Sequence, residues 1–178
     1  TTSYVAFYNF GDVGQNEDDR IVSGYKYEGV VIPQIQYLSN NRSVALKDNG
    51  FTIYQGSQIP KEVKTVETDK EIVSTFYDDD MIGMVFKNDS KDKQYTMEVY
   101  TTEGKLKFKQ DFNIPYTTIR LSGGNIFMYN SSQMCVMNSR GVQKYMGSVD
   151  GTIKDFFKIG WNRYMLVLDS GVDVIKLS

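Results

Sequence analysis

Four hairpin-turn sequences recur along this chain at nearly constant spacing. They are Asp48-Asn49-Gly50, Asp89-Ser90, Ser131-Ser132 and Asp169-Ser170-Gly171, and their first residues lie 41, 42 and 38 residues apart. Tight turns between antiparallel strands favour Asn, Asp, Ser and Gly. Short strands that repeat with a period of about 40 to 45 residues are typical of the blades of a β-propeller. The repeat therefore predicts an architecture, although it says nothing about chemistry.

A second internal match supports the repeat. Two stretches superpose at a shift of 37 residues, which places Met97, Val99, Gly104 and Phe108 on Met134, Val136, Gly141 and Tyr145. In each stretch an apolar run leads into a turn that contains glycine, which supplies the positive φ of tight hairpins. Matched turns and apolar positions in the same order indicate repeated structural units.

The segments between the turns have the composition of strands. Residues 82–86, 126–129 and 164–168 are short, apolar and rich in β-forming residues. Residues 95–100 alternate in polarity, as a half-exposed strand does. Residues 61–71 could form a helix, but their Thr and Val residues favour an exposed outer strand equally well. The sequence predicts an all-β protein.

A blade has four antiparallel strands, named a to d from the propeller axis outward. We assign strands c and d of an incomplete first blade to 3–10 and 20–28, with 11–20 as a polar, acidic loop between them. The first complete blade takes 31–38, 42–47, 50–55 and 59–67, and the second takes 71–77, 81–88, 94–101 and 105–112. The third takes 116–121, 124–130, 133–138 and 142–149. The last blade takes 152–159, 163–169 and 171–177 and has no fourth strand.

This assignment leaves both ends of the array incomplete, and the ends do not complete each other because both supply a strand c. Open sheet edges promote association. Either residues 1–178 are the C-terminal part of a longer propeller of seven or eight blades, or two copies associate. We favour a missing N-terminal half, with which Thr1 as first residue agrees.

Composition narrows the possible partners. The 178 residues carry a net charge of −2 with both signs interspersed, so the basic patch of a nucleic-acid-binding protein is missing. No apolar run approaches the roughly 20 residues of a membrane span, which predicts no direct membrane contact from this segment. The single cysteine excludes an internal disulfide. We treat residues 1–178 as one β-propeller domain.

The residue types required for common catalytic sites are scarce. The sequence has no histidine, which excludes Ser-His-Asp and Cys-His catalysis within this chain and makes a zinc site with one cysteine very unfavourable. Carboxylate pairs for glycoside hydrolysis stay open, because such pairs can come from distant strands. We assign no catalytic, cofactor-binding or metal-ligating residue and predict no cofactor.

Several residues admit both a structural and a functional interpretation. For Cys135 we favour a small apolar core residue over a reactive thiol. For Asp78-Asp79-Asp80 and the acidic run 16–19 we favour solvated turns over calcium ligands. For Trp161, in a predicted turn between strands a and b, we favour an aromatic plug between blades over an exposed anchor for a sugar or a protein.

Two further patterns carry less weight. Residues 148–152 partly match the structural Asp-box of sialidase-type propellers, without its spacing or its closing aromatic residue. Asn41, Asn88 and Asn130 begin Asn-x-Ser sequences, which matter only in a host that glycosylates proteins.

Four segments carry a resemblance to a known family: Asp48 to Tyr54, Gln58-Ile59-Pro60, Ile82 to Phe86 and Met97 to Tyr100. They resemble an uncharacterised family of Gram-positive bacteria, a domain of unknown function, over about residues 25–177. In that family a propeller-like region follows an N-terminal membrane anchor. The resemblance implies an extracytoplasmic protein tethered to the membrane by an upstream segment, and it carries no functional residue.

From these features we expect a non-catalytic β-propeller of the bacterial cell envelope that binds a protein or glycan partner or serves as a scaffold. Two alternatives stay open. One is a glycan-active enzyme whose key residues lie partly upstream, and the other is an extracytoplasmic sensor domain. Fold does not decide between them, because propellers support both binding and catalysis.

Overall fold

The computed structural model describes residues 1–11, 20–90 and 92–177, and in these residues every regular element is a β-strand. The expected loop over 11–20 and the acidic run 16–19 fall largely outside the described residues. The strands form five antiparallel sheets in chain order: a two-stranded N-terminal hairpin, three four-stranded sheets and a final three-stranded sheet. The all-β prediction and the assignment of strands to blades are confirmed.

The strand bounds follow the assignment closely. The N-terminal hairpin comprises β1 (Thr2–Tyr8) and β2 (Ile21–Glu28). The first sheet comprises β3 (Gln34–Leu38), β4 (Arg42–Lys47), β5 (Gly50–Gln55) and β6 (Lys61–Glu67). The second comprises β7 (Ile72–Tyr77), β8 (Met81–Lys87), β9 (Tyr95–Thr101) and β10 (Leu106–Phe112). The third comprises β11 (Thr118–Ser122), β12 (Asn125–Tyr129), β13 (Gln133–Asn138) and β14 (Gln143–Ser148). The fourth comprises β15 (Ile153–Lys158), β16 (Arg163–Leu168) and β17 (Gly171–Lys176).

The small differences in bounds have local causes. The strand expected from residue 31 begins at Gln34, directly after Pro33, which has no amide hydrogen for the ladder. The segment 61–71, for which a helix was the alternative, is strand β6 up to Glu67. The four recurring turn sequences all lie between the second and third strands of a sheet.

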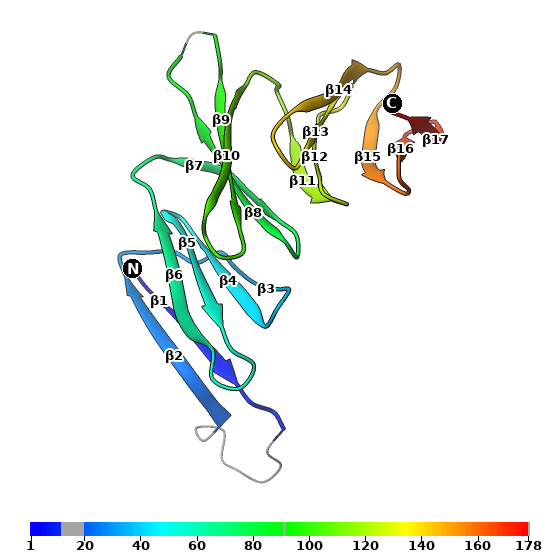
Figure 1. Ribbon diagram of the computed structural model, residues 1–178. Coiled ribbons are helices and arrows are strands. Elements are labelled where there is room, and N and C mark those ends of the chain that lie inside the picture. The colour runs from blue at the N-terminus through cyan, green and yellow to red at the C-terminus, as the bar shows by residue number, and fades with distance from the viewer. Residues whose placement is uncertain (12–19, 91, 178) are drawn as a thin grey trace.

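The sheets follow one another along a curved path, and the two ends of the chain lie at opposite ends of this path (Figure 1). Each sheet packs face to face with its neighbours in sequence. Because successive side chains of a strand point to opposite faces, the central strands carry apolar residues on both faces. Along β12, for example, Ile126 and Met128 face the second sheet while Phe127 and Tyr129 face the fourth.

Four apolar clusters fill the spaces between successive sheets. We call them the hairpin cluster (Val5, Phe7, Ala45, Tyr54), the first–second cluster (Val44, Leu46, Phe51, Ile53, Ile82, Met84, Phe86 and others), the second–third cluster (Met81, Val85, Met97, Val99, Ile126, Met128, Cys135, Met137 and others) and the third–fourth cluster (Phe127, Tyr129, Met134, Val136, Ile153, Phe156, Tyr164, Leu166). The core is therefore a series of layers rather than one centre.

The match at a shift of 37 residues corresponds to repeated geometry. Gly104 and Gly141 both have positive φ, of 75° and 78°, in the turns that follow β9 and β13. Their amides donate to Thr101 O and Asn138 O at 2.9 and 3.0 Å. A Cβ on either glycine would lie within 3 Å of a side chain from the outer strand of the preceding sheet. Glycine is thus needed both for the turn and for the approach of neighbouring sheets.

Candidate functional site

The innermost strands of neighbouring sheets are joined by polar side chains. Between the first and second sheets, Gln34 Nε2 donates to Tyr77 Oη at 2.7 Å, and Tyr77 Oη donates to Gln36 Oε1 at 3.0 Å. Between the second and third sheets, Ser74 and Tyr116 share a hydrogen bond of 2.8 Å. These contacts link one sheet to the next, so they account for the polar residues on these strands without a ligand.

The third and fourth sheets are joined by an ion pair at the equivalent place. Arg120 Nη2 donates to Asp155 Oδ1 at 2.6 Å, and Tyr129 Oη donates to the same oxygen at 2.9 Å. Burial, followed by the hydrogen bond to Asp155, raises the pKa of Tyr129. The Asp155 carboxylate therefore links the third sheet to the fourth, and we interpret its contacts with Arg120 and Tyr129 as structural.

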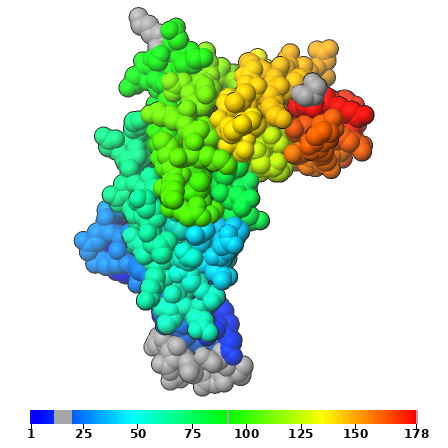
Figure 2. Space-filling model, in the orientation of Figure 1, coloured from blue at the N-terminus to red at the C-terminus, as the bar shows by residue number. Residues whose placement is uncertain are grey.

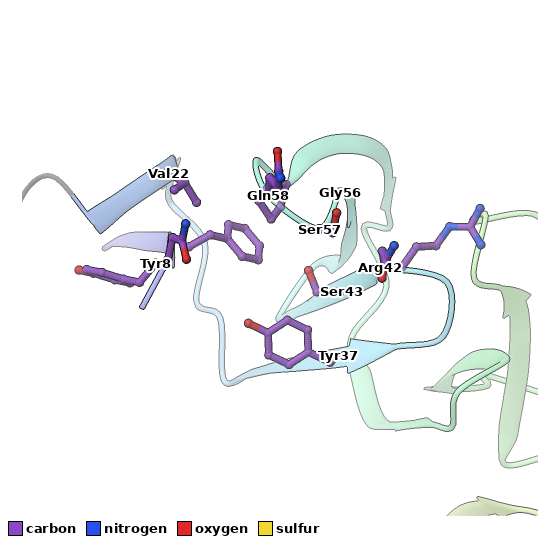
Figure 3. Close-up of a pocket in the computed structure, with 12 residues that line it drawn as sticks. Tyr8, Val22, Tyr37, Arg42, Ser43, Gly56, Ser57 and Gln58 are labelled. Carbon is purple, nitrogen blue, oxygen red and sulfur yellow. The ribbon is translucent and has the colours of Figure 1, made fainter. Parts of the chain in front are cut away.

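A pocket of about 460 Å³ lies where the N-terminal hairpin meets the first sheet. It is lined from the end of β1, the start of β2, the turn between β3 and β4 and the turn between β5 and β6. The lining residues are Phe7, Tyr8, Asn9, Val22, Tyr37, Asn41, Arg42, Ser43, Gly56, Ser57, Gln58 and Pro60. In Figure 3, Tyr37, Ser43 and Ser57 surround the opening from the side of the first sheet.

The lining combines apolar rings with neutral hydrogen-bonding groups. Tyr37 is 75% exposed, whereas Phe7 is buried in the hairpin cluster beside the pocket. Among the described lining residues, Arg42 is the one whose side chain is charged at neutral pH. Its guanidinium extends away from the pocket (Figure 3), and its Nη1 donates to Glu103 Oε1 at 2.9 Å and to Thr102 Oγ1 at 3.3 Å. The described lining is thus neutral.

Two tyrosines, the buried Tyr54 and the half-buried Tyr27, hold the hairpin that forms one wall of this pocket. Tyr27 Oη is hydrogen-bonded to Tyr54 Oη and donates to Glu62 Oε2 at 2.9 Å. Burial raises the pKa of Tyr27 to about 12, and it also raises the pKa of Tyr54. Lys47, whose side chain is almost fully buried, lies over the Tyr27 ring and pairs with Glu67. This wall is therefore attached by a polar network in addition to apolar contact.

Among the described residues, no sheet packs on the face of the fourth sheet that points away from the third sheet, whereas the first, second and third sheets each have a neighbour on both faces. The third strand of the fourth sheet, β17, is exposed along nearly its whole length, with Val172 59% and Val174 48% exposed. The corresponding strands β5, β9 and β13 are largely buried. The fourth sheet lies at the end of the path, next to the third sheet (Figure 2).

Trp161 does not pack between blades, so the preferred sequence interpretation was wrong. It lies in the expected turn between β15 and β16 and is 93% exposed. A plug requires a neighbouring sheet, and within the described residues the fourth sheet has a neighbour on one face only. The alternative, an exposed aromatic side chain at a turn, matches the structure.

The other residues considered from the sequence have structural positions. Cys135 is buried in the second–third cluster, as expected, and burial raises its pKa to about 12. Asp78 forms the expected turn, since its Oδ1 accepts from the amides of Asp80 and Met81 at 2.9 and 2.8 Å. Within the described ranges no group of three or more acidic, cysteine or histidine residues is placed to hold a metal ion.

The Asn-x-Ser sequences and the partial Asp-box also lie in or beside turns. Asn88 Nδ2 donates to Thr96 Oγ1, and Asn130 Nδ2 donates to Pro115 O, so both amides are already engaged. Asn41 has a φ of 56° and lines the pocket. Residues 148–152 run from the end of β14 to the start of β15, so they link the third sheet to the fourth.

Sequence reasoning did not find the pocket. Its residues come from two turns of one sheet and from a hairpin that precedes that sheet, so no local spacing marks them. Gln58 lies in a segment that supported the family resemblance, but nothing in that segment indicates a ligand.

A family model matches residues 1–177 and is described as a family of unknown function, DUF5711. The chain belongs to this family. No curated protein matches the sequence.

Solved structures of β-propeller type are similar to this family member in fold. BBS1N, in a crystal structure with ARL6DN, has a TM-score of 0.53 at 11% identity, covering 85% of this chain and 54% of that one. HIRA(644–1017) has a TM-score of 0.57 at 12% identity, covering 80% and 50%. BamB from Moraxella catarrhalis has a TM-score of 0.51 at 10% identity, covering 93% and 46%. The DUF5711 chain thus spans about half the length of these structures, and the likeness establishes its β-propeller fold.

Within the residues that the structure describes, no helix has the length and apolar character that crossing a bilayer requires.

Proposed function

We propose that this DUF5711 chain is a non-catalytic binding module of the cell envelope, and that its pocket between the hairpin and the first sheet binds a neutral glycan. The observation that carries the proposal is a 460 Å³ pocket whose described lining residues are neutral except for Arg42, which is paired with Glu103 outside the pocket. Pockets of about 300 to 1,000 Å³ are of the size that holds small ligands.

The lining chemistry suits a sugar. The exposed ring of Tyr37 offers an apolar surface with a hydroxyl at its end, which is how aromatic side chains contact amphipathic ligands. Asn9, Ser57 and Gln58 carry donors and acceptors without charge, as the hydroxyl and acetamido groups of a glycan require. A general acid or base would need a titratable group in this lining, and the described lining supplies none with a carboxylate or imidazole.

The test is to add a neutral probe, N-acetylglucosamine oligosaccharides, and to detect binding by NMR and by thermal unfolding. A ligand present at about 100 times its dissociation constant adds about 2.7 kcal/mol to the free energy of unfolding. Tyr37→Ala should weaken binding at least tenfold, whereas Tyr4→Ala, on an exposed tyrosine outside the pocket, should leave binding unchanged. Equal binding by both variants, or no shift of pocket resonances at millimolar oligosaccharide, would refute a glycan pocket.

A protein partner is the second candidate, and Trp161 favours it. The turn that holds Trp161 connects the first and second strands of its sheet, and the turn between β3 and β4 beside the pocket has the same place in its own sheet. BBS1N, which is similar in fold, was crystallised in complex with ARL6DN. Exposed tryptophans commonly anchor protein contacts. If a partner is captured, Trp161→Ala should release it and Tyr37→Ala should not.

The cellular setting is also part of the proposal. We propose that residues 1–178 form the C-terminal part of a longer propeller of seven or eight blades, located outside the cytoplasm and tethered by an upstream anchor. The support for this setting is the resemblance described in the sequence analysis, which implies a propeller-like region that follows a membrane anchor. Protease added to intact cells should cleave the domain; protection until the cells are lysed would contradict an extracytoplasmic location.

A further inference from the structure

A second pocket, of about 560 Å³, lies between the outer parts of the second and third sheets. One wall comes from the segment before β9 and from the end of β10 with the residues that follow it. The other wall comes from the end of β13, the turn into β14 and β14 itself. Both sheets have four strands and a neighbouring sheet on each face, so the pocket is formed by two complete repeats.

Arg140 brings a positive charge to this pocket from the turn between β13 and β14. The shift of 37 residues places it on Glu103, in the turn between β9 and β10. Glu103 is paired at 2.9 Å with Arg42, the first residue of β4 in the preceding sheet. The first residue of β8, which has the same place in the second sheet, is the uncharged Met81. The position that neutralises Glu103 therefore offers no charge to Arg140, which forms no ion pair among the described residues.

The other two charged residues of the lining are Lys93 and Asp111, both from the wall of the second sheet. Lys93 is exposed and forms no ion pair within the part of the chain that the structure describes. Asp111 Oδ1 accepts a hydrogen bond from the buried Thr96 Oγ1 at 2.7 Å, and Thr96 Oγ1 accepts one from Asn88 Nδ2 at 3.0 Å. Two cationic side chains without a partner thus share the lining with one carboxylate that is already engaged.

The turn that carries Arg140 is held in place by its own hydrogen bonds. Asn138 Oδ1 accepts from the amides of Arg140 and Val142 at 2.9 and 3.1 Å. On the other side of the turn, a Cβ on Gly141 would lie 2.6 Å from the Phe108 ring of β10, so the turn packs closely on the second sheet. A site that is ordered before the ligand arrives loses less entropy on binding.

The lining also exposes apolar surface on the side of the third sheet. Val142 is 57% exposed and Met146 is 52% exposed. Methionine is flexible and adapts to ligands of different shape. The described lining therefore combines unpaired positive charge with apolar side chains, whereas the pocket beside the hairpin is lined by neutral groups.

We propose that this second pocket binds an organic anion, in which a carboxylate or phosphate group contacts Arg140 and Lys93 and an aliphatic body covers Val142 and Met146. Arginine presents a planar fork of donors that matches both kinds of oxyanion. Removal of the aliphatic body from water adds to the affinity. The site shares no lining residue with the proposed glycan pocket, so it does not depend on that proposal.

Hexanoate and hexyl phosphate are the probes, and 1-hexanol and acetate are their matched controls. At millimolar concentration both probes should shift the NMR resonances of Arg140, Val142 and Met146. Hexanol lacks the charge and acetate lacks the aliphatic body, so each should bind at least about fivefold more weakly than hexanoate. Higher ionic strength should weaken binding of hexanoate and leave binding of hexanol unchanged, because salt screens the interaction of exposed charges.

Matched variants test the residues. Arg140→Gln should weaken hexanoate binding about tenfold, the loss expected for a charge-assisted hydrogen bond. Lys144→Gln, on an exposed lysine of β14 outside the pocket, is the control and should leave binding unchanged. Met146→Ser should reduce the preference for hexanoate over acetate while it leaves acetate binding as it was. Thermal unfolding of each variant verifies that it is folded.

The proposal is overturned if both probes leave the three resonances unchanged, or if hexanol binds as tightly as hexanoate. It is also overturned if Lys144→Gln weakens binding as much as Arg140→Gln does. Binding of either probe with the expected effects of the variants supports the site, and the tighter probe identifies its head group. Binding of N-acetylglucosamine oligosaccharides should be unaffected by Arg140→Gln, so the two proposed sites can fail separately.

Discussion

The second–third cluster and the hairpin cluster both join neighbouring sheets, yet they do so with different chemistry. The second–third cluster is built from many apolar side chains, both sulfur-containing, such as Met97 and Met128, and aromatic, such as Phe76. The hairpin cluster is smaller, and beside it lies the polar network of Tyr27, Tyr54 and Lys47. The middle of the array is thus held mainly by burial of apolar surface, whereas the hairpin depends in addition on hydrogen bonds and an ion pair. The two interfaces should respond differently to mutation.

The largest effect is expected from truncation in the second–third cluster. Met128→Ala removes a fully buried side chain and leaves a cavity, which should lower the free energy of unfolding by about 2 to 5 kcal/mol. Denaturant unfolding measures this loss. Leu106→Ala, at an exposed position of the second sheet, is the control and should change stability by less than about 0.5 kcal/mol. Similar losses in both variants would mean that the layers are not the source of stability.

Overpacking should also weaken the middle of the array. A Cβ on Gly83 would lie 2.0 Å from the Phe76 ring, and Phe76 is itself buried in the second–third cluster. Gly83→Ala should therefore cost about 1 to 3 kcal/mol in denaturant unfolding. The double variant Gly83→Ala with Phe76→Leu should recover part of this loss; a loss unaffected by the residue at position 76 would rule out the clash as its cause.

A smaller loss is expected in the hairpin network. Tyr54→Phe removes the hydroxyl that meets Tyr27 but keeps the ring that packs on Phe7 and Tyr25. The variant should lose about 0.5 to 1.5 kcal/mol, the usual contribution of one hydrogen bond. Hydrogen exchange should show faster opening of β1 and β2 and unchanged protection of β12. Equal acceleration in both regions would show that the hairpin does not open separately.

The contribution of Tyr27 to stability should change with pH in the alkaline range. An unfolded tyrosine ionises at about pH 10, whereas the pKa of Tyr27 in the folded chain is about 12 because of burial. The folded state then holds the proton that the unfolded state releases, so this contribution to stability is complete below pH 10 and is lost as the pH rises from 10 to 12. Tyr27→Phe should flatten the pH dependence of hairpin opening; a slope that persists would assign it to other groups.

The layered interior could be predicted from the sequence because each layer repeats a local pattern. The turns before Gly50 and Gly171, the apolar runs and the glycines at 104 and 141 are all readable within a few residues. The environment of Trp161 could not be predicted, because a plug and an exposed anchor differ only in whether a further sheet lies beside it. The pocket escaped detection for the same reason, since its walls meet only after the hairpin packs on the first sheet.

Each sheet completes its strand pairing with consecutive strands, and this affects how the sequence of such a chain can evolve. Every ladder described here begins and ends inside one sheet of consecutive strands, and each sheet packs only on the sheets next to it in sequence. Stability of arrays with nearest-neighbour packing is approximately a sum over units and their junctions. Duplication or deletion of a whole blade of about 40 residues therefore preserves every remaining junction, while insertion of half a blade breaks two. Genes for such chains can grow and shrink by complete blades.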